Sequence, residues 1–166
     1  IMVDCHARPS PRMGLRFAKA LEPYGLYFFE EPCWPETLED IAACQRAVTT
    51  PIATGERLIG VHAFRDLLEK RAASVLQPDI TKSGGITRNL PLARATVANG
   101  KAFCPHVFGG GVALIASLHL LAAVGGDGLL EFDCHPNAGR ELVVSSTSNP
   151  DGPERRGGHR LLRTAR

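Results

Sequence analysis

The amino-acid sequence predicts an α/β fold, a partial (β/α) barrel of the TIM type with about six βα units. Six times along the chain a short apolar run ends on an ionisable residue: Asp4, Glu30, Glu56, Asp79, His106 and Glu131. These residues are 26, 26, 23, 27 and 25 positions apart, close to the length of one βα unit. Because parallel barrel strands end at one face, where the catalytic residues of this fold lie, we expect all six side chains at one mouth.

The segment 26–32 shows best why the predicted strands end where they do. Its apolar run meets Glu30-Glu31-Pro32, and proline cannot donate to a sheet ladder. Alternation places Phe28 and Glu30 on one face of the strand and Phe29 and Glu31 on the other. A single acid at a strand tip could be only a helix cap or an ion-pair partner, but six ionisable residues in register favour a site.

The segments between the strands carry helix signals. A capping box at 37–40 opens the second helix, and a glycine turn at 83–85 precedes the fourth. Helical spacing puts one set of apolar residues on one face in each of three segments. These sets are Met13, Phe17, Ala20, Leu21 and Tyr24 in the first helix; Phe64, Leu67 and Leu68 in 61–70; and Leu90, Ala93 and Val97 in the fourth.

The last predicted helix, 112–124, is almost uniformly apolar and follows three glycines at 109–111. Exposed N–H groups in such a loop suit an anion, although a tight loop explains the glycines equally well. Uniform hydrophobicity predicts burial on several sides. Within this helix we expect His119 to be a hydrogen-bonded core residue and not a ligand.

Length and composition bound the domain organisation. The 166 residues carry a net charge of +2 and are 44% hydrophobic, an ordinary globular balance that favours neither nucleic-acid binding nor disorder. A closed barrel of eight strands needs about 250 residues, so two strands are missing and we expect the C-terminal part of a larger or truncated protein. Residues 1–142 form the predicted barrel portion. Residues 143–166, rich in arginine but without periodicity, form a predicted irregular, solvated tail.

Cysteine usage and hydropathy indicate the compartment. The five cysteines are odd in number and include no C-x-x-C pair, which argues against disulfides and zinc and fits a reducing cytoplasm. The longest apolar run, 112–124, is too short to span a bilayer. We therefore expect a cytoplasmic protein with neither membrane nor nucleic acid as a partner.

Three of the strand-tip residues suit a metal. Asp4, Glu30 and Glu56 end three consecutive strands, and converging carboxylates without a cysteine or histidine triad favour Mg²⁺ over zinc. Such an ion stabilises the enediolate formed when a proton is removed next to a substrate carboxylate.

Two histidines are candidates for proton transfer. His106 is a candidate base, with Asp79 on the preceding strand holding one tautomer of its imidazole. His6, two residues after Asp4, is a second candidate acid or base. The alternative role for His6 is a hydrogen bond that only orients Asp4.

Several motifs, in this order, resemble the enolase superfamily, in its mandelate racemase branch. They are Val3-Asp4, Phe29-Glu30-Glu31-Pro32, Pro51-Ile52-Ala53-Thr54-Gly55-Glu56-Arg57, Gln77-Pro78-Asp79, Ser83-Gly84-Gly85-Ile86 and Pro105-His106. The resemblance implies a modified TIM barrel with an N-terminal α+β capping domain, which is absent here together with the first two strands. It also implies roles for the strand-tip residues: Asp4, Glu30 and Glu56 as Mg²⁺ ligands, Asp79 and His106 as the general-base dyad, and Glu131 as a hydrogen-bond partner of the substrate carboxylate.

Two positions narrow the branch. Asp79 stands where a lysine would mark the muconate cycloisomerase and dipeptide epimerase type. Asp4-Cys5-His6 replaces the usual Asp-x-Asn and resembles sugar-acid dehydratases of the galactonate dehydratase kind, in which that histidine is an acid/base.

The sequence thus predicts a Mg²⁺-dependent sugar-acid dehydratase, a hydro-lyase with a small sugar acid as substrate, and a homo-oligomer when full length. A racemase or epimerase of a 2-hydroxy acid in the same superfamily is the first alternative. An inactive truncated remnant that associates through its exposed barrel edge is the second.

Overall fold

Strands and helices alternate along the chain in the computed structural model, which describes residues 1–125, 128–133, 135–138, 140 and 161–164. The elements are β1 (Met2–Asp4), α1 (Pro11–Leu21), the 3-10 turn η1 (Glu22–Tyr24), β2 (Phe28–Glu30), α2 (Leu38–Ala47), β3 (Ile52–Thr54), α3 (His62–Glu69), β4 (Val75–Leu76), α4 (Gly85–Ala98), β5 (Ala102–Phe103), β6 (His106–Val107), α5 (Gly111–Val124), β7 (Leu130–Asp133) and β8 (Leu161–Thr164).

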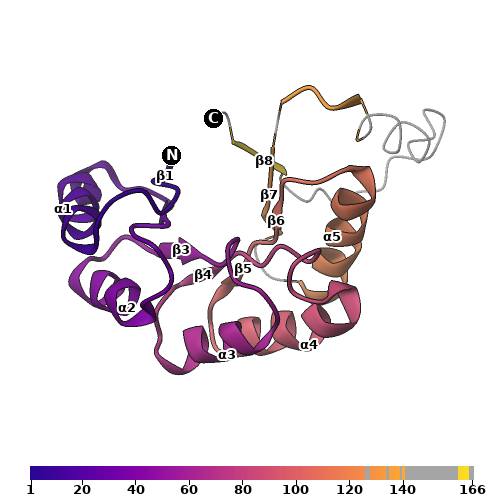
Figure 1. The fold of residues 1–166 in the computed structure, drawn as a ribbon, viewed down its shortest axis with the longest axis horizontal. Coiled ribbons are helices and arrows are strands. Elements are labelled where there is room, and N and C mark those ends of the chain that lie inside the picture. The colour runs from indigo at the N-terminus through magenta and orange to yellow at the C-terminus, as the bar shows by residue number, and fades with distance from the viewer. Residues whose placement is uncertain (126–127, 134, 139, 141–160, 165–166) are drawn as a thin grey trace.

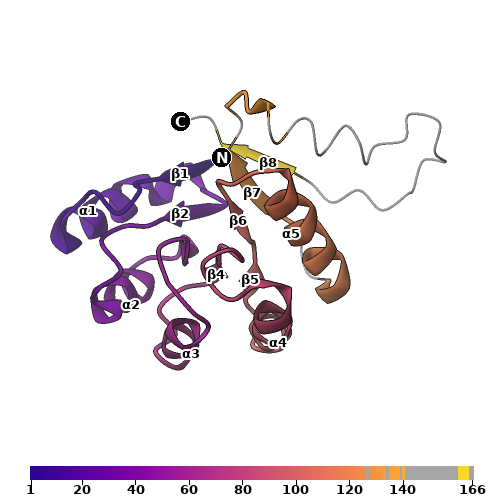
Figure 2. The ribbon, with the colours of Figure 1, turned by 45° about the vertical axis from the view of Figure 1, so that its right-hand side comes forward.

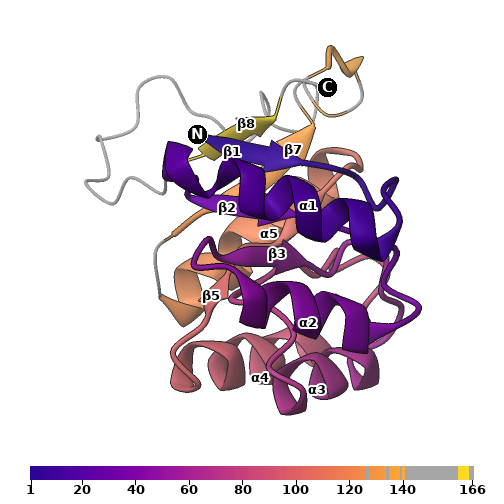
Figure 3. The same ribbon diagram turned by 90° about the vertical axis from the view of Figure 1, so that its left-hand side faces the viewer.

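All strand pairs are parallel and follow the order of the chain. Strands β1 to β5 form one sheet, β6 to β8 form another, and a bridge between Asp79 and His106 joins the two. Strands β5 and β6 are two parts of one strand position in the barrel, interrupted at Cys104-Pro105. Helices α1 to α5 lie in an arc outside the strands (Figures 1 and 2), and α1 packs beside α2 (Figure 3). The predicted partial parallel barrel is confirmed.

The end of the chain differs from the predicted irregular tail. Strand β8 pairs in parallel with β7 through four residue pairs, from Leu130 with Leu161 to Asp133 with Thr164. The prediction is therefore wrong at 161–164, whereas 143–160 lie outside the described residues. A strand of four residues is too short to show a hydrophobic period in the sequence. It forms because the unpaired backbone N–H and C=O groups along the edge of β7 favour pairing with another strand. The boundary at residue 142 stays a prediction.

Strand residues alternate between two apolar clusters. Phe29, Ile52 and Leu76 pack against the helices, whereas their neighbours Phe28, Ala53 and Val75 pack in a second cluster on the other side of the sheet. This is the alternation predicted for Phe28 and Phe29. It puts Glu30, two residues after Phe28, on the inner side, away from the helices.

Helix α1 does not pack through the predicted apolar face. Its buried residues are Gly14 and Ala18, whereas Phe17 is 42% exposed and Tyr24, in η1, is 71% exposed. Of the predicted face, Leu21 alone is partly buried against the core. A Cβ built on Gly14 would lie 1.9 Å from the carbonyl oxygen of Pro32. The helix therefore approaches the loop after β2 through its smallest residue, a contact that hydrophobic spacing cannot indicate.

We expect Gly14→Ala to destabilise the protein although alanine is the better helix former. Overpacking costs about 1–3 kcal/mol, which outweighs a helix-propensity gain of up to about 1 kcal/mol. Chemical denaturation would measure the change in the free energy of unfolding. Lys19→Ala on the exposed side of the same helix is the matched control, and equal stability of the two variants would contradict the close approach.

The other helices largely follow their patterns. Phe64 and Leu67 are fully buried in α3, and Ala93 of α4 is fully buried with Leu90 and Val97 packed beside it. Helix α5 is the exception. Its Leu120 and Leu121 are buried, but Val112 is 73% exposed and His119 is exposed as well, so the expected core role of His119 is wrong.

The sequence also predicts unpaired cysteines and no membrane-spanning helix. Cys5, Cys33, Cys44 and Cys104 are free thiols, and Cys134 lies outside the described residues. Among the helices of the described part of the chain, none has the length and apolar character needed to cross a membrane.

Candidate active site

Strand register brings the predicted site residues to one mouth. Asp4 lies opposite Glu30, Asp79 opposite His106, and His106 opposite Glu131. Glu56 follows β3, two residues after Thr54. Five of these six ionisable side chains are buried, with Asp4 alone on the exposed rim: Glu30 1%, Glu56 4%, Asp79 5%, His106 4% and Glu131 2% exposed.

Glu30 has the environment expected of a metal ligand. Neither oxygen of its carboxylate makes a hydrogen bond of ordinary geometry with a described residue, although the nearby amide of Gln77 opposes the rise in its pKa. Burial raises the pKa of Glu30 to about 9, with further contributions from the charges of Glu131 and Asp4. A buried carboxylate in this setting either keeps its proton or meets a cation, so the donor set fits a hard divalent ion.

His106 and Asp79 form the predicted pair. Nδ1 of His106 lies 3.3 Å from Oδ2 of Asp79, and Nε2 lies 2.9 Å from Oε2 of Glu56. Burial alone would lower the pKa of His106, but the hydrogen bonds that its ring nitrogens make to the carboxylates of Asp79 and Glu56 outweigh it and raise the pKa to about 10.

Thr81 keeps Asp79 ionised and oriented. Its backbone N–H and its hydroxyl both donate to Oδ1 of Asp79, at 2.9 and 2.6 Å, which leaves Oδ2 for His106. Burial would raise the pKa of Asp79, but the bonds from His106 and Thr81 lower it to about 2. The dyad therefore carries a hydrogen-bonded carboxylate behind the imidazole.

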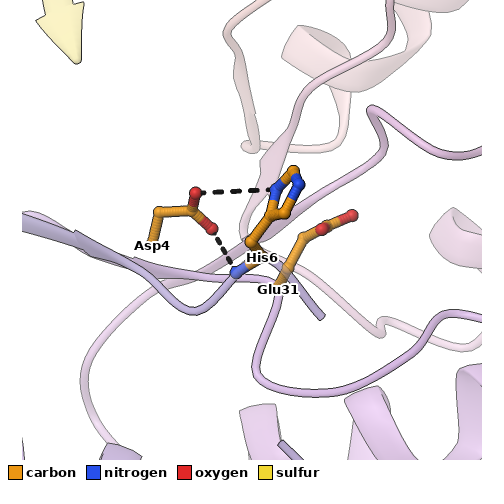
Figure 4. Close-up of side chains that lie close together, drawn as sticks. All are labelled: Asp4, His6 and Glu31. Carbon is orange, nitrogen blue, oxygen red and sulfur yellow. Dashed lines mark hydrogen bonds and ion pairs between the residues drawn. The ribbon is translucent and has the colours of Figure 1, made fainter. Parts of the chain in front are cut away.

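His6 occupies the other side of Glu56. Its Nδ1 lies 3.2 Å from Oε1 of Glu56 and 3.8 Å from Oδ2 of Asp4, and its backbone N–H donates to Oδ1 of Asp4. Figure 4 shows the Asp4 carboxylate facing both the ring and the backbone nitrogen of His6, with Glu31 on the adjacent strand end. The two histidines thus contact different oxygens of one carboxylate.

Two groups of side chains in the described residues offer ligand atoms within 4.8 Å of one another: Asp4, His6 and Glu31, and Glu56, His106 and Glu131. Neither is the predicted set Asp4, Glu30 and Glu56, which stays a prediction. In the first group the guanidinium of Arg57 already lies 2.8 Å from Glu31, so that carboxylate has a counter-ion from the chain.

Four residues that contact the site had no predicted role. Gln77 donates to Oε2 of Glu131 at 2.8 Å, and Lys82 donates to the backbone oxygen of Glu56 at 3.0 Å. Arg57 pairs with Glu31, which is fully buried. Burial, then the charge of Glu56, raises the pKa of Glu31 to about 7, and Arg57 acts against this. Gln77, Arg57 and Glu31 all stand inside the recognised motifs, beside the residues that received roles, and that adjacency was the available signal.

Comparison with known proteins identifies the family. The model of the family described as enolase C-terminal domain-like matches residues 1–164. The chain belongs to the enolase superfamily. A D-galactonate dehydratase from Ralstonia nicotianae is 37% identical to it over 143 residues, which are 85% of this chain and 37% of that protein.

Solved structures show the same relationship. A mandelate racemase/muconate lactonizing enzyme from Bordetella bronchiseptica RB50 matches with a TM-score of 0.80 and 39% identity over 86% of this chain and 40% of that one. The 3,6-anhydro-D-galactonate cycloisomerase from Zobellia galactanivorans matches with a TM-score of 0.76 and 27% identity, over 84% of this chain and 40% of that one. The chain spans about two fifths of the length of these enolase-superfamily relatives.

Proposed function

We propose that the enzyme carrying this chain is a Mg²⁺-dependent dehydratase of sugar acids, a hydro-lyase. The observation that supports this best is the placement of His6 and His106 on the two oxygens of Glu56, at 3.2 and 2.9 Å. Dehydration of a 2,3-dihydroxy acid needs one group to take the α-proton and another to protonate the departing β-hydroxyl. The similarity to D-galactonate dehydratases points to the same chemistry.

The metal would be held by Asp4, Glu30 and Glu56. The buried Glu30 carboxylate, neither oxygen of which makes a hydrogen bond of ordinary geometry with a described residue, supports this assignment. When bound, Mg²⁺ supplies positive charge where negative charge develops on the substrate carboxylate. Glu131, held by Gln77, is the proposed hydrogen-bond partner of that carboxylate.

The histidines have complementary tasks in this reaction. His106 accepts the proton from the α-carbon, and Asp79 stabilises the imidazolium that forms. Asp79, and after it Glu56, raise the pKa of His106 to about 10, and a cation bound to Glu56 would remove the second of these contributions. His6 donates a proton to the β-hydroxyl, which leaves as water. The resulting enol then takes a proton at the β-carbon and becomes a 2-keto-3-deoxy acid.

A racemase or epimerase of 2-hydroxy acids is the second candidate. Two imidazoles on separate oxygens of one carboxylate also suit a base on each face of an α-carbon. Racemisation has no leaving group, and the role of His6 therefore discriminates between the two reactions.

His6→Asn is expected to lower the rate of dehydration by about 10²-fold or more while His106 continues to exchange the α-proton. A panel of sugar acids that includes D-galactonate would be assayed for 2-keto-3-deoxy acid, and ¹H NMR in D₂O would follow the α-proton. His119→Asn, on the exposed side of α5, is the matched control. Dehydration by His6→Asn at the wild-type rate would remove the dehydratase assignment and favour the racemase.

A further inference from the structure

Arg57 connects the ends of three consecutive strands. Its Nε lies 2.8 Å from Oε2 of Glu31 after β2, and its Nη2 lies 3.5 Å from Oε1 of Glu56 after β3. The same Nη2 donates to the backbone oxygen of His6 after β1, at 3.3 Å. The guanidinium also stacks over the ring of Trp34, 4.9 Å from its centroid. One side chain therefore contacts the three segments that carry the proposed acid and the proposed metal ligands.

The backbone at these contacts is unusual. His6, Ala7 and Glu31 have φ values of 50°, 56° and 42°, in the left-handed region that non-glycine residues rarely adopt. Such conformations persist only where the surrounding structure holds them. The two turns are tied together by the hydrogen bond from the N–H of Ala7 to the backbone oxygen of Glu31, at 3.1 Å. The side chain of Arg57 links the same two turns through the carboxylate of Glu31 and the backbone oxygen of His6.

A guanidinium suits these contacts better than an ammonium. Its planar fork directs Nε and Nη2 to separate acceptors with fixed geometry, and its face stacks on an aromatic ring. Lysine would supply the same charge as a single point and would reach one acceptor well. The side chain of Glu31 is fully buried, so its carboxylate depends on this partner.

We propose that Arg57, anchored by Glu31, is a positioning residue that sets the ring of His6 against Glu56. The inference rests on the proposed function for its kinetic consequence, because it assumes that His6 protonates the leaving hydroxyl. Arg57 itself need not contact the reacting atoms. Its loss would free the strained turn at His6 and displace the imidazole, and a displacement of about 1 Å in an active site can cost on the order of 10²-fold in rate.

The first test uses Arg57→Lys in the active enzyme, with Arg65→Lys on the exposed side of α3 as its control. The expected result is a loss of kcat for dehydration of about 10²-fold, a KM within about threefold of wild type, and retained exchange of the α-proton. Exchange reports on His106, so its retention places the defect at His6. Wild-type kcat in Arg57→Lys would overturn the proposal, as would equal loss of exchange and dehydration.

The second test separates positioning from folding. Arg57→Met leaves Glu31 buried without its partner and is expected to lower the Tm. The double variant Arg57→Met/Glu31→Gln removes the uncompensated charge and is expected to recover most of the lost Tm. Dehydration should stay low in both. Recovery of kcat together with Tm in the double variant would show a purely structural role and overturn the proposal.

The third measurement does not depend on dehydratase activity. In ¹⁵N-histidine-labelled protein, Arg57→Lys should shift the ring resonances of His6 and leave those of the exposed His119 unchanged. If the wild type dehydrates no sugar acid but the His6 signals move, the proposed function fails and the positioning role stands. Unchanged His6 signals would remove the positioning role whatever the activity.

Discussion

His106→Asn is expected to lower kcat for dehydration by about 10²- to 10⁴-fold, the usual contribution of a positioned general base. His106 is the imidazole that Asp79 backs: its Nδ1 lies 3.3 Å from Asp79 and its Nε2 lies 2.9 Å from Glu56. The α-proton exchange that survives in His6→Asn should also disappear, because both reactions begin with its removal. Steady-state kinetics and deuterium incorporation would measure the two effects.

The matched variant is Asp79→Asn, which keeps the shape of the pair but removes the charge that stabilises the imidazolium. A smaller loss than in His106→Asn is expected, because Thr81 still orients the residue at 79 through its backbone N–H. Full α-proton exchange in His106→Asn would show that another group is the base. The acid/base assignment would then have to be exchanged between His6 and His106.

Glu30→Gln is expected to stabilise the metal-free protein and to abolish its stabilisation by Mg²⁺. The pKa of Glu30 in the folded protein is about 9, above its ordinary value near 4.5, because burial, and then the charges of Glu131 and Asp4, disfavour the ionised carboxylate. The contribution of Glu30 to the free energy of unfolding is therefore complete below about pH 4.5 and is lost as the pH rises towards 9. It amounts to about 1.4 kcal/mol for each unit by which the pKa in the folded protein exceeds that in the unfolded protein. Glutamine stays neutral throughout this range, so the variant does not lose stability as the pH rises.

Thermal unfolding at pH 6 and pH 9, in EDTA and in Mg²⁺, would test this. Wild-type protein should gain more from Mg²⁺ at pH 9, since binding needs the ionised carboxylate. Glu36→Gln, an exposed residue of the loop after β2, should behave as wild type. An equal gain from Mg²⁺ in Glu30→Gln and wild type would show that Glu30 is not a ligand.

The period of the strands and the spacing of their polar tips determined most of what the sequence revealed. Each predicted strand is present, Phe28 and Phe29 face opposite sides, and the register between neighbouring strands brings the six tips to one mouth. These features follow from local alternation within each strand and from the repetition of βα units about every 25 residues, both of which can be read along the sequence. The proximity of Asp79 and His106 could be predicted for the same reason.

Only the tertiary structure decided how the tips are held. The contacts of Arg57 with Glu31 and His6 span 26 and 51 residues and depend on left-handed turns that no periodicity encodes. Close backbone approach brought Gly14, in place of the larger apolar residues, to the inner side of α1, and pairing with the free edge of β7 gave order to Leu161–Thr164. Local pattern determines which residues reach the mouth. The distance between two polar atoms there depends on packing across several strands, which is a property of the assembled fold.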